Sequence, residues 1–291
     1  MKALLCLEAR ALSLGFLLFC CAGLPASSIV AVLSGNQVPY QEALEGLKAT
    51  VGGQVDSAVL PDKPDLSQAK VVVTFGTQAA MENYPNQLQV YALVPDETAR
   101  PGSSRGKPTR VEMLPQPEVL AEHVLQLQPN LKALAAINVN DGYTAFLDQL
   151  EAALAAKGVV LVRANVDGAG DLPAALRKAK DKAQGLWMPP EPLLLNLQNF
   201  NLAVTFCDSF GIALYAPVAS LAKIGALAGI APGFKDVGSA AGKAAQARLA
   251  GGGDEVVYPH RTVVALNTDT AAKAGITFSP EARKSADAVY P

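Results

Sequence analysis

The sequence lacks the residue patterns on which most enzyme and metal sites depend. Its two histidines, His123 and His260, are not spaced from another histidine or a cysteine as metal ligands are. It has no glycine triad of dinucleotide binding, no phosphate-loop Gly-Lys-Ser/Thr and no Gly-x-Ser-x-Gly elbow between a strand and a helix. We therefore predict no enzymatic activity, no metal and no cofactor.

Cysteine and positive charge are also scarce. Of four cysteines, only Cys207 lies beyond residue 21, so the rest of the chain has no partner for an intramolecular disulfide. We expect Cys207 to be a small buried apolar residue. Without the first 26 residues, 22 basic groups face 25 acidic ones, and such a balance gives no positive surface for nucleic acid. A remainder of about 265 residues is long enough to form a stable hydrophobic core.

The start of the chain has the layout of a secretory signal peptide. Two basic residues precede the uncharged run 11–24, and the small residues Ala26, Ser27 and Ser28 follow it. This run of 14 residues is shorter than the ~20 that span a bilayer as a helix, so cleavage is favoured over anchoring. We predict a signal peptide over 1–26 and a periplasmic location. Lipid anchoring at Cys20 or Cys21 is a minor alternative.

The rest of the chain alternates short apolar runs with longer helical patterns. Such alternation is typical of parallel sheets with helical crossovers, and uninterrupted apolar runs suit strands that are buried on both faces. The predicted strands are 29–33, 70–75, 88–94, 131–139, 159–166, 186–188 and 212–215. The predicted helices are 39–50, 117–127, 143–157, 172–183 and 193–210.

A loop rich in glycine, proline, serine and arginine, ARPGSSRGKP at 99–108, separates two such series. The sequence therefore predicts an α/β protein of two Rossmann-like lobes with parallel sheets and a ligand cleft between them. In open α/β sheets, ligands sit beyond the carboxyl ends of the strands, so the cleft should lie where two such edges meet.

Several segments, in this order, resemble one family. They are IVAVLSGN, YQEALEGLK, VVVTFGTQAA, EVLAEHVLQLQPNLKALAAINVND, GLWMPPEPLL, GIALYAPVASLAKIGALAGIAP, KDVGSAAGKAAQARLAGG and VALNTDTAAKAGITFSPEARKSADAV. The match is closest between 115 and 287. The chain resembles the substrate-binding proteins of ABC transporters that have the type I periplasmic-binding-protein fold, a family that includes tryptophan- and tyrosine-type solute receptors.

The resemblance implies a protein that closes two lobes around a small solute, an amino acid or a related compound, and delivers it to an ABC permease. It implies a monomer with lobe 1 over 27–114 plus 232–252 and lobe 2 over 115–231 plus 253–291. Connections between the lobes are expected near 112–117, 231–233 and 251–256. Two alternatives remain: a ligand-binding sensor domain for a signalling partner and, less favoured, a periplasmic α/β enzyme.

The sequence departs from this family at two turns. Many relatives carry an acidic Ser-Asp turn after the strand that corresponds to IALYAP, where this chain has Val218-Ala219-Ser220. They also carry a Pro-Thr-Asp turn where this chain has Pro189-Pro190-Glu191. Since an amino-acid ligand needs an acceptor for its ammonium group, Glu191 is the leading candidate for that role.

The predicted ligand-binding residues follow strands or begin the helices after them. The prediction comprises Ser34, Gly35, Asn36, Tyr40, Gly76, Thr77, Gln78, Asn138, Asn140, Glu191 and Ser220. Hydroxyl and amide groups beside free helix N–H groups suit a ligand carboxylate. Each position also has a purely structural interpretation: a polar turn, a helix cap, a surface aromatic or an acid that complements a helix dipole. Trp187 is expected in the core.

Overall fold

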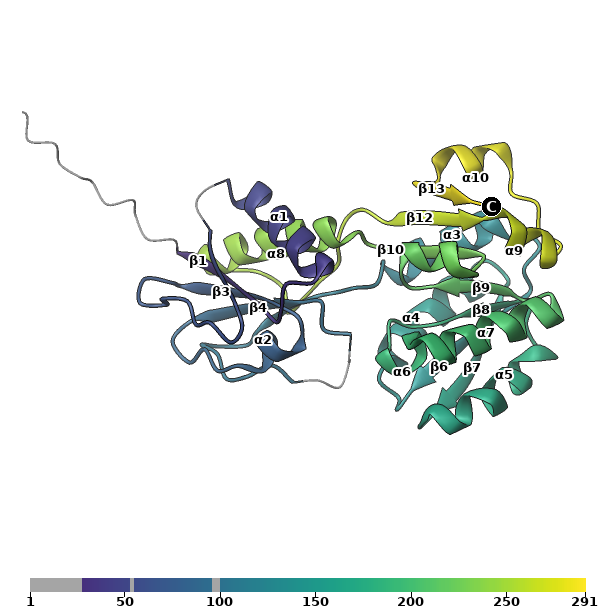
Figure 1. Ribbon diagram of the computed structural model, residues 1–291, viewed down its shortest axis with the longest axis horizontal. Helices are drawn as coiled ribbons and strands as arrows, with labels where there is room; N and C mark the ends of the chain where they lie inside the picture. Colours follow the sequence, from purple (N-terminus) through teal and green to yellow (C-terminus); the bar gives the residue numbers. More distant parts are fainter. Residues whose placement is uncertain (1–27, 53–54, 96–99) are drawn as a thin grey trace, which may run out of the picture.

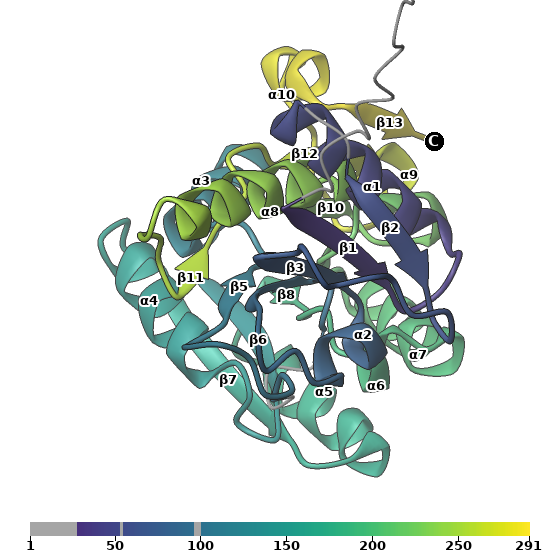
Figure 2. The ribbon, with the colours of Figure 1, turned by 90° about the vertical axis from the view of Figure 1, so that its left-hand side faces the viewer.

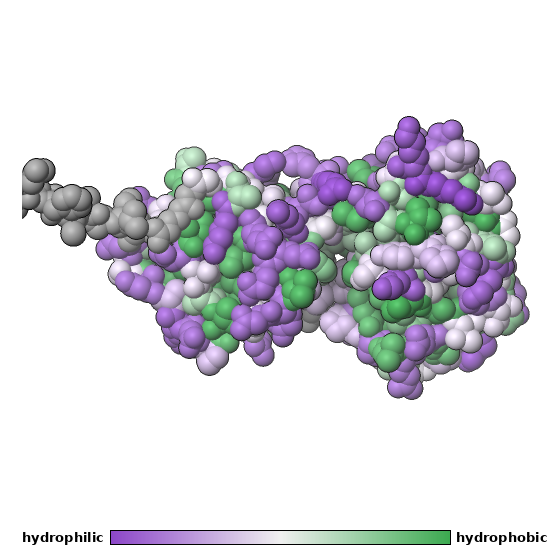
Figure 3. All heavy atoms as spheres, turned by 45° about the horizontal axis from the view of Figure 1, so that its top comes forward, coloured by the Kyte–Doolittle hydropathy of each residue, from purple (hydrophilic) through white to green (hydrophobic). Residues whose placement is uncertain are grey.

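The computed structural model describes residues 28–52, 55–95 and 100–291. The predicted signal peptide, with Cys20 and Cys21, lies outside these residues. Two lobes stand side by side and are joined by three chain segments (Figure 1). In a space-filling view each lobe is a bulky half, and the molecule narrows between them (Figure 3). Among the described residues, no helix combines the length and apolar character needed to cross a bilayer.

The first lobe is built on a sheet of six strands in the order β11-β5-β4-β3-β1-β2, all parallel. The strands are β1 (Ile29–Leu33), β2 (Asp56–Val59), β3 (Val71–Phe75), β4 (Leu88–Ala92), β5 (Thr109–Val111) and β11 (Val256–Val257). β1 and β3 are buried along their whole length, as their unbroken apolar runs predict.

Helices α1 (Val38–Val51) and α8 (Phe234–Leu249) lie side by side over one face of this sheet, with the short α2 (Thr77–Met81) near the other face (Figure 2). Two glycines let α1 and α8 approach closely. A Cβ added to Gly238 would lie 1.8 Å from the Ala43 carbonyl oxygen, and one added to Gly46 would lie 2.0 Å from that of Lys235. Side chains at these positions would force the helices apart.

The second lobe has a sheet of seven strands in the order β13-β12-β10-β9-β8-β6-β7. The strands are β6 (Ala133–Val139), β7 (Val160–Val166), β8 (Gly185–Trp187), β9 (Ala213–Ala216), β10 (Ala228–Ala231), β12 (Val263–Asn267) and β13 (Ala288–Tyr290). β12 runs antiparallel to β10, whereas the other strand pairs of this sheet are parallel, so the predicted parallel sheet is confirmed except at this pair.

Helices cover both faces of the second sheet. They are α3 (Pro117–Leu127), α4 (Thr144–Ala155), α5 (Leu172–Lys180), α6 (Pro192–Leu195), α7 (Leu197–Phe210), α9 (Thr268–Lys273) and α10 (Pro280–Ser285), with 3-10 turns η1 (Ala169–Asp171) and η2 (Ala219–Ile224). Trp187 is fully buried and stacks on Phe146, which confirms its place in the core. Cys207 is also buried, in the cluster on the α7 side of the sheet.

The chain crosses between the lobes at 112–116, 232–233 and 258–262, since these residues join strands or helices of different lobes. The first two crossings match the expected positions. The third differs, because β11 pairs with β5 in the first sheet, through Arg110 N–H to Glu255 O and Glu112 N–H to Val257 O. Residues 253–257 therefore lie with the first lobe rather than the second.

Candidate functional site

A cavity of about 230 Å³ lies between the two lobes, beside all three crossings. The first lobe contributes residues of α1, α8 and the end of β4, and the second contributes the turn after β9. The lining residues are Glu42, Leu93, Met113, Pro217, Val218, Ala219, Ser220, Ala231, Pro232, Gly233, Phe234, Val237 and Val263. A ligand in this cavity would therefore contact both lobes and the segments on which they turn.

Three of the predicted residues converge at the carboxyl ends of β1 and β3. A Cβ on Gly76 would lie 2.6 Å from the Tyr40 hydroxyl and 2.7 Å from Ser34 Oγ, so the glycine makes room for both. Gly76 also has φ of 92°, a left-handed conformation that glycine adopts without strain. Ser34 Oγ accepts a hydrogen bond from Ala79 N–H at 2.9 Å. That hydroxyl oxygen thus already caps α2, and burial raises the pKa of Tyr40.

The other predicted residues of the first lobe stand around this group. Asn36 is exposed, and its Oδ1 accepts a hydrogen bond from Gln41 Nε2 at 3.2 Å. Gly35 approaches the side chain of Gln37, while Thr77 is half-buried at the start of α2. Gln78 is exposed and lines a separate pocket formed by residues of the first lobe, among them Leu60 and Glu82. These side chains do not line the cavity between the lobes.

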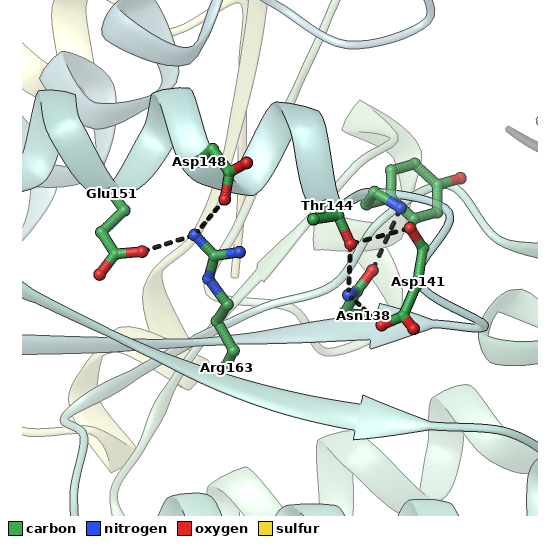
Figure 4. A network of polar contacts seen from close by, with 7 residues as sticks. Asn138, Asp141, Thr144, Asp148, Glu151 and Arg163 are labelled. Carbon is green, nitrogen blue, oxygen red and sulfur yellow. Dashed lines mark hydrogen bonds and ion pairs between the residues drawn. The ribbon is translucent and has the colours of Figure 1, made fainter.

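In the second lobe, Asn138 holds together the turn that follows β6 (Figure 4). Its Nδ2 donates to Asp141 Oδ1 at 3.3 Å and to Thr144 Oγ1 at 3.2 Å. Its Oδ1 accepts from Tyr143 N–H at 3.1 Å, and the side chain is only 2% exposed. These contacts support the structural interpretation of Asn138, because the turn itself uses both ends of its amide.

A second, polar pocket of about 480 Å³ opens beside this turn, along β7 and α5. Arg163 and Lys178 are its basic lining residues. Arg163 forms ion pairs with Asp148 and Glu151 of α4 (Figure 4). The pocket lies within one lobe. A ligand there would not join the two lobes, so the cavity between them is the better candidate site.

The remaining predicted residues of the second lobe lie apart from one another. Asn140 is exposed with φ of 46°. Glu191 is half-buried, does not line the cavity and precedes α6, where its carbonyl accepts from Leu194 and Leu195 N–H. Ser220 is exposed and is the one predicted residue that lines the cavity between the lobes.

One contact between the lobes was not predicted. The hydroxyl of Tyr143, at the start of α4, donates to the carbonyl oxygen of Pro95, just beyond β4, at 2.7 Å. Tyr143 is 1% exposed, and its ring packs in the core of the second lobe. No local pattern in the sequence signals this bond, because the two residues are far apart in the chain.

The apolar residues of the crossings were also missed. Met113, Pro232 and Phe234 lie in or beside predicted connections, yet only polar strand-end residues were considered as ligand contacts. They could have been predicted by also considering the apolar side chains of the connections as residues that line the cleft.

The segment Gly-Ser-Ser-Arg-Gly at 102–106 fits the Gly-x-Ser-x-Gly pattern by sequence. They precede strand β5 rather than a helix, and Ser104 Oγ donates to the Gly106 carbonyl at 3.1 Å. This is not the strand-turn-helix geometry that exposes a nucleophilic serine.

No protein-family model matches the sequence, and no curated protein matches it. Solved structures do match the fold. A domain from Streptococcus pneumonia in complex with L-Trp is 17% identical, with a TM-score of 0.60 over 90% of this chain and 99% of that one. A ligand-free, open substrate-binding protein with adhesive properties from Clostridium difficile is 14% identical, with a TM-score of 0.62 over 90% and 98%.

The fold is shared beyond such proteins. The transcription regulator CcpA of Lactococcus lactis is 8% identical, with a TM-score of 0.50 over 82% of this chain and 97% of that one. Two α/β lobes, three crossings and a cavity between the lobes agree with these likenesses. This chain has the type I periplasmic-binding-protein fold.

Proposed function

We propose that the protein is an extracytoplasmic solute-binding protein, which captures a small molecule by closing its lobes and delivers it to an ABC permease. The observation that carries this proposal is the cavity, since both lobes and two of the three crossings line it. A ligand that contacts both lobes stabilises one lobe separation over others, and this differential affinity drives closure.

The location and the partners belong to the same proposal. The leader pattern over 1–26 supports export to the periplasm. There the protein would act as a monomer that delivers its solute to a membrane permease. The cited neighbours are binding proteins and a regulator, which fits binding rather than catalysis. The proposed solute is an amino acid or a related compound.

A ligand panel with two readouts tests the proposal. Purified protein is screened for thermal stabilisation by amino acids, amines, carboxylates, purines and sugars, because a ligand that binds only the folded state raises the melting temperature. Small-angle scattering then measures the radius of gyration with each ligand that binds. A smaller radius on binding is expected. Binding with an unchanged radius would refute capture by lobe closure.

A further inference from the structure

The cavity between the lobes is almost entirely apolar. Among the described residues that line it, only Glu42 and Ser220 have polar side chains, and none is basic. The apolar lining comes from every direction: Leu93 from the first lobe, Val218 from the second and Met113 from a crossing. A ligand that fills this space must be largely apolar, because a polar group buried there without a partner is destabilising.

A carboxylate already lies at the helix N-terminus that borders the cavity. Helix α8 begins at the cavity, where Gly233 is its N-cap, and a helix N-terminus attracts anions. However, a Cβ on Gly233 would lie 2.8 Å from Asp236 Oδ2, so the carboxylate of Asp236 covers this terminus. Arg261 forms ion pairs with Asp236 and Asp287. A ligand carboxylate would meet negative charge here.

Glu42 is the one charged side chain that lines the cavity. It is exposed and has no ion-pair partner among the residues that the structure describes. Its neighbour Glu45 differs, since Glu45 pairs with Lys235 at 3.8 Å and does not line the cavity. Glu42 is therefore placed to receive a cation at the mouth of an apolar space.

The volume limits the size of the ligand. A cavity of about 150 Å³ in another protein binds benzene, so about 230 Å³ accommodates one ring with a short chain.

We infer, on the basis of the proposed function, that the solute is a hydrophobic amine without a carboxylate. Its apolar part fills the cavity between Leu93, Met113 and Val218, and its ammonium group pairs with Glu42. This narrows the proposed solute class from amino acids and related compounds to cationic relatives that lack the acid group.

Four ligands that share one ring test the inference by calorimetric titration: phenethylamine, phenylalanine, 3-phenylpropionate and 2-phenylethanol. We expect phenethylamine to bind at least tenfold more tightly than either carboxylate. Glu42→Gln should weaken phenethylamine about two- to fivefold, the range of an exposed ion pair, and leave phenylethanol unchanged. Glu45→Gln is the matched control and should change neither affinity. Ala219→Leu, which fills the cavity, should abolish binding of all four.

Each contrary result has a distinct meaning. Equal or tighter binding of phenylalanine or phenylpropionate would overturn the solute class and leave lobe closure intact. An unchanged phenethylamine affinity in Glu42→Gln would overturn the role of that carboxylate. If none of the four binds, the inference is wrong, whereas the proposed function stands or falls on the wider panel and the scattering measurement. Phenethylamine binding without a smaller radius of gyration would count against the proposed function alone.

Discussion

Replacing Tyr143 by phenylalanine removes a hydrogen bond that joins the two lobes. The hydroxyl donates at 2.7 Å to the carbonyl of Pro95, while the ring remains in the core of the second lobe. Tyr143 begins α4, and Pro95 follows β4 of the other lobe. Rotation about the crossings would change the distance between these two loops, so we expect the proposed lobe closure to break the bond.

The expected effect is tighter ligand binding. A hydrogen bond of this kind contributes about 0.5–1.5 kcal/mol net, and it stabilises the separation of the lobes seen in this structure. Without it, closure is less unfavourable by that amount, so the dissociation constant should fall about 2- to 12-fold. Isothermal titration with any ligand found by the panel measures the change, and scattering should show a smaller mean radius for the unliganded variant.

Tyr215→Phe is the matched control. The Tyr215 hydroxyl donates to Gln128 Oε1 at 3.0 Å, and both residues belong to the second lobe. This variant should lower the free energy of unfolding without changing ligand affinity. Unchanged or weaker binding in Tyr143→Phe would refute the reasoning, because the bond would then persist in the closed form or stabilise it.

Three further predictions concern stability and reactivity. Gly238→Ala should lower the free energy of unfolding by about 1–3 kcal/mol, since its Cβ would clash with Ala43, whereas Gly252→Ala, whose Cβ would meet nothing nearer than 3.8 Å, should be nearly neutral in urea unfolding. Burial raises the Cys207 pKa to about 12, so a thiol reagent at pH 8 should label it only after unfolding. Burial lowers the His123 pKa below 6.5, so the contribution of His123 to the free energy of unfolding should be full above about pH 6.5 and decrease as pH falls through that value. His123→Gln should make the free energy of unfolding less dependent on pH in this range. An unchanged pH dependence in the variant would contradict the prediction.

Much of the fold follows from the sequence because periodicity is local. Apolar runs such as 29–33 and 131–139 indicate buried strands, and helical spacing between such runs indicates crossovers. The antiparallel direction of strand β12 does not follow from this alternation. The chain leaves the second lobe after β10 and returns through 258–262, so no crossover helix within the lobe fixes the direction of β12. The predicted helix 193–210 is two helices, because Asn196 Oδ1 accepts from Asn199 N–H and starts α7 afresh.

The candidate site was harder to predict than the fold. That Ser34 and Gly76 meet follows from the pairing of β1 with β3, which brings their carboxyl ends together. That the Ser34 oxygen already accepts from Ala79 does not follow, since it depends on the orientation of one hydroxyl. The apolar cavity is formed by both lobes and by crossings that are distant in sequence, and side chains such as Met113 and Phe234 resemble ordinary core residues until the lobes are assembled.

Residues with strained backbone conformations lie close in sequence to the hydrogen bond between the lobes. Among the described residues, the non-glycine residues with positive φ are Leu93, at 57°, Asn140 and Asp141. Leu93 directly follows β4 and Asn140 directly follows β6, so both lobes carry this strain at a strand end that faces the other lobe. Each strained segment lies two residues before a partner of the bond between Tyr143 and Pro95. Such conformations persist only where surrounding contacts enforce them, and the bond between Tyr143 and Pro95 is one such contact between the two loops.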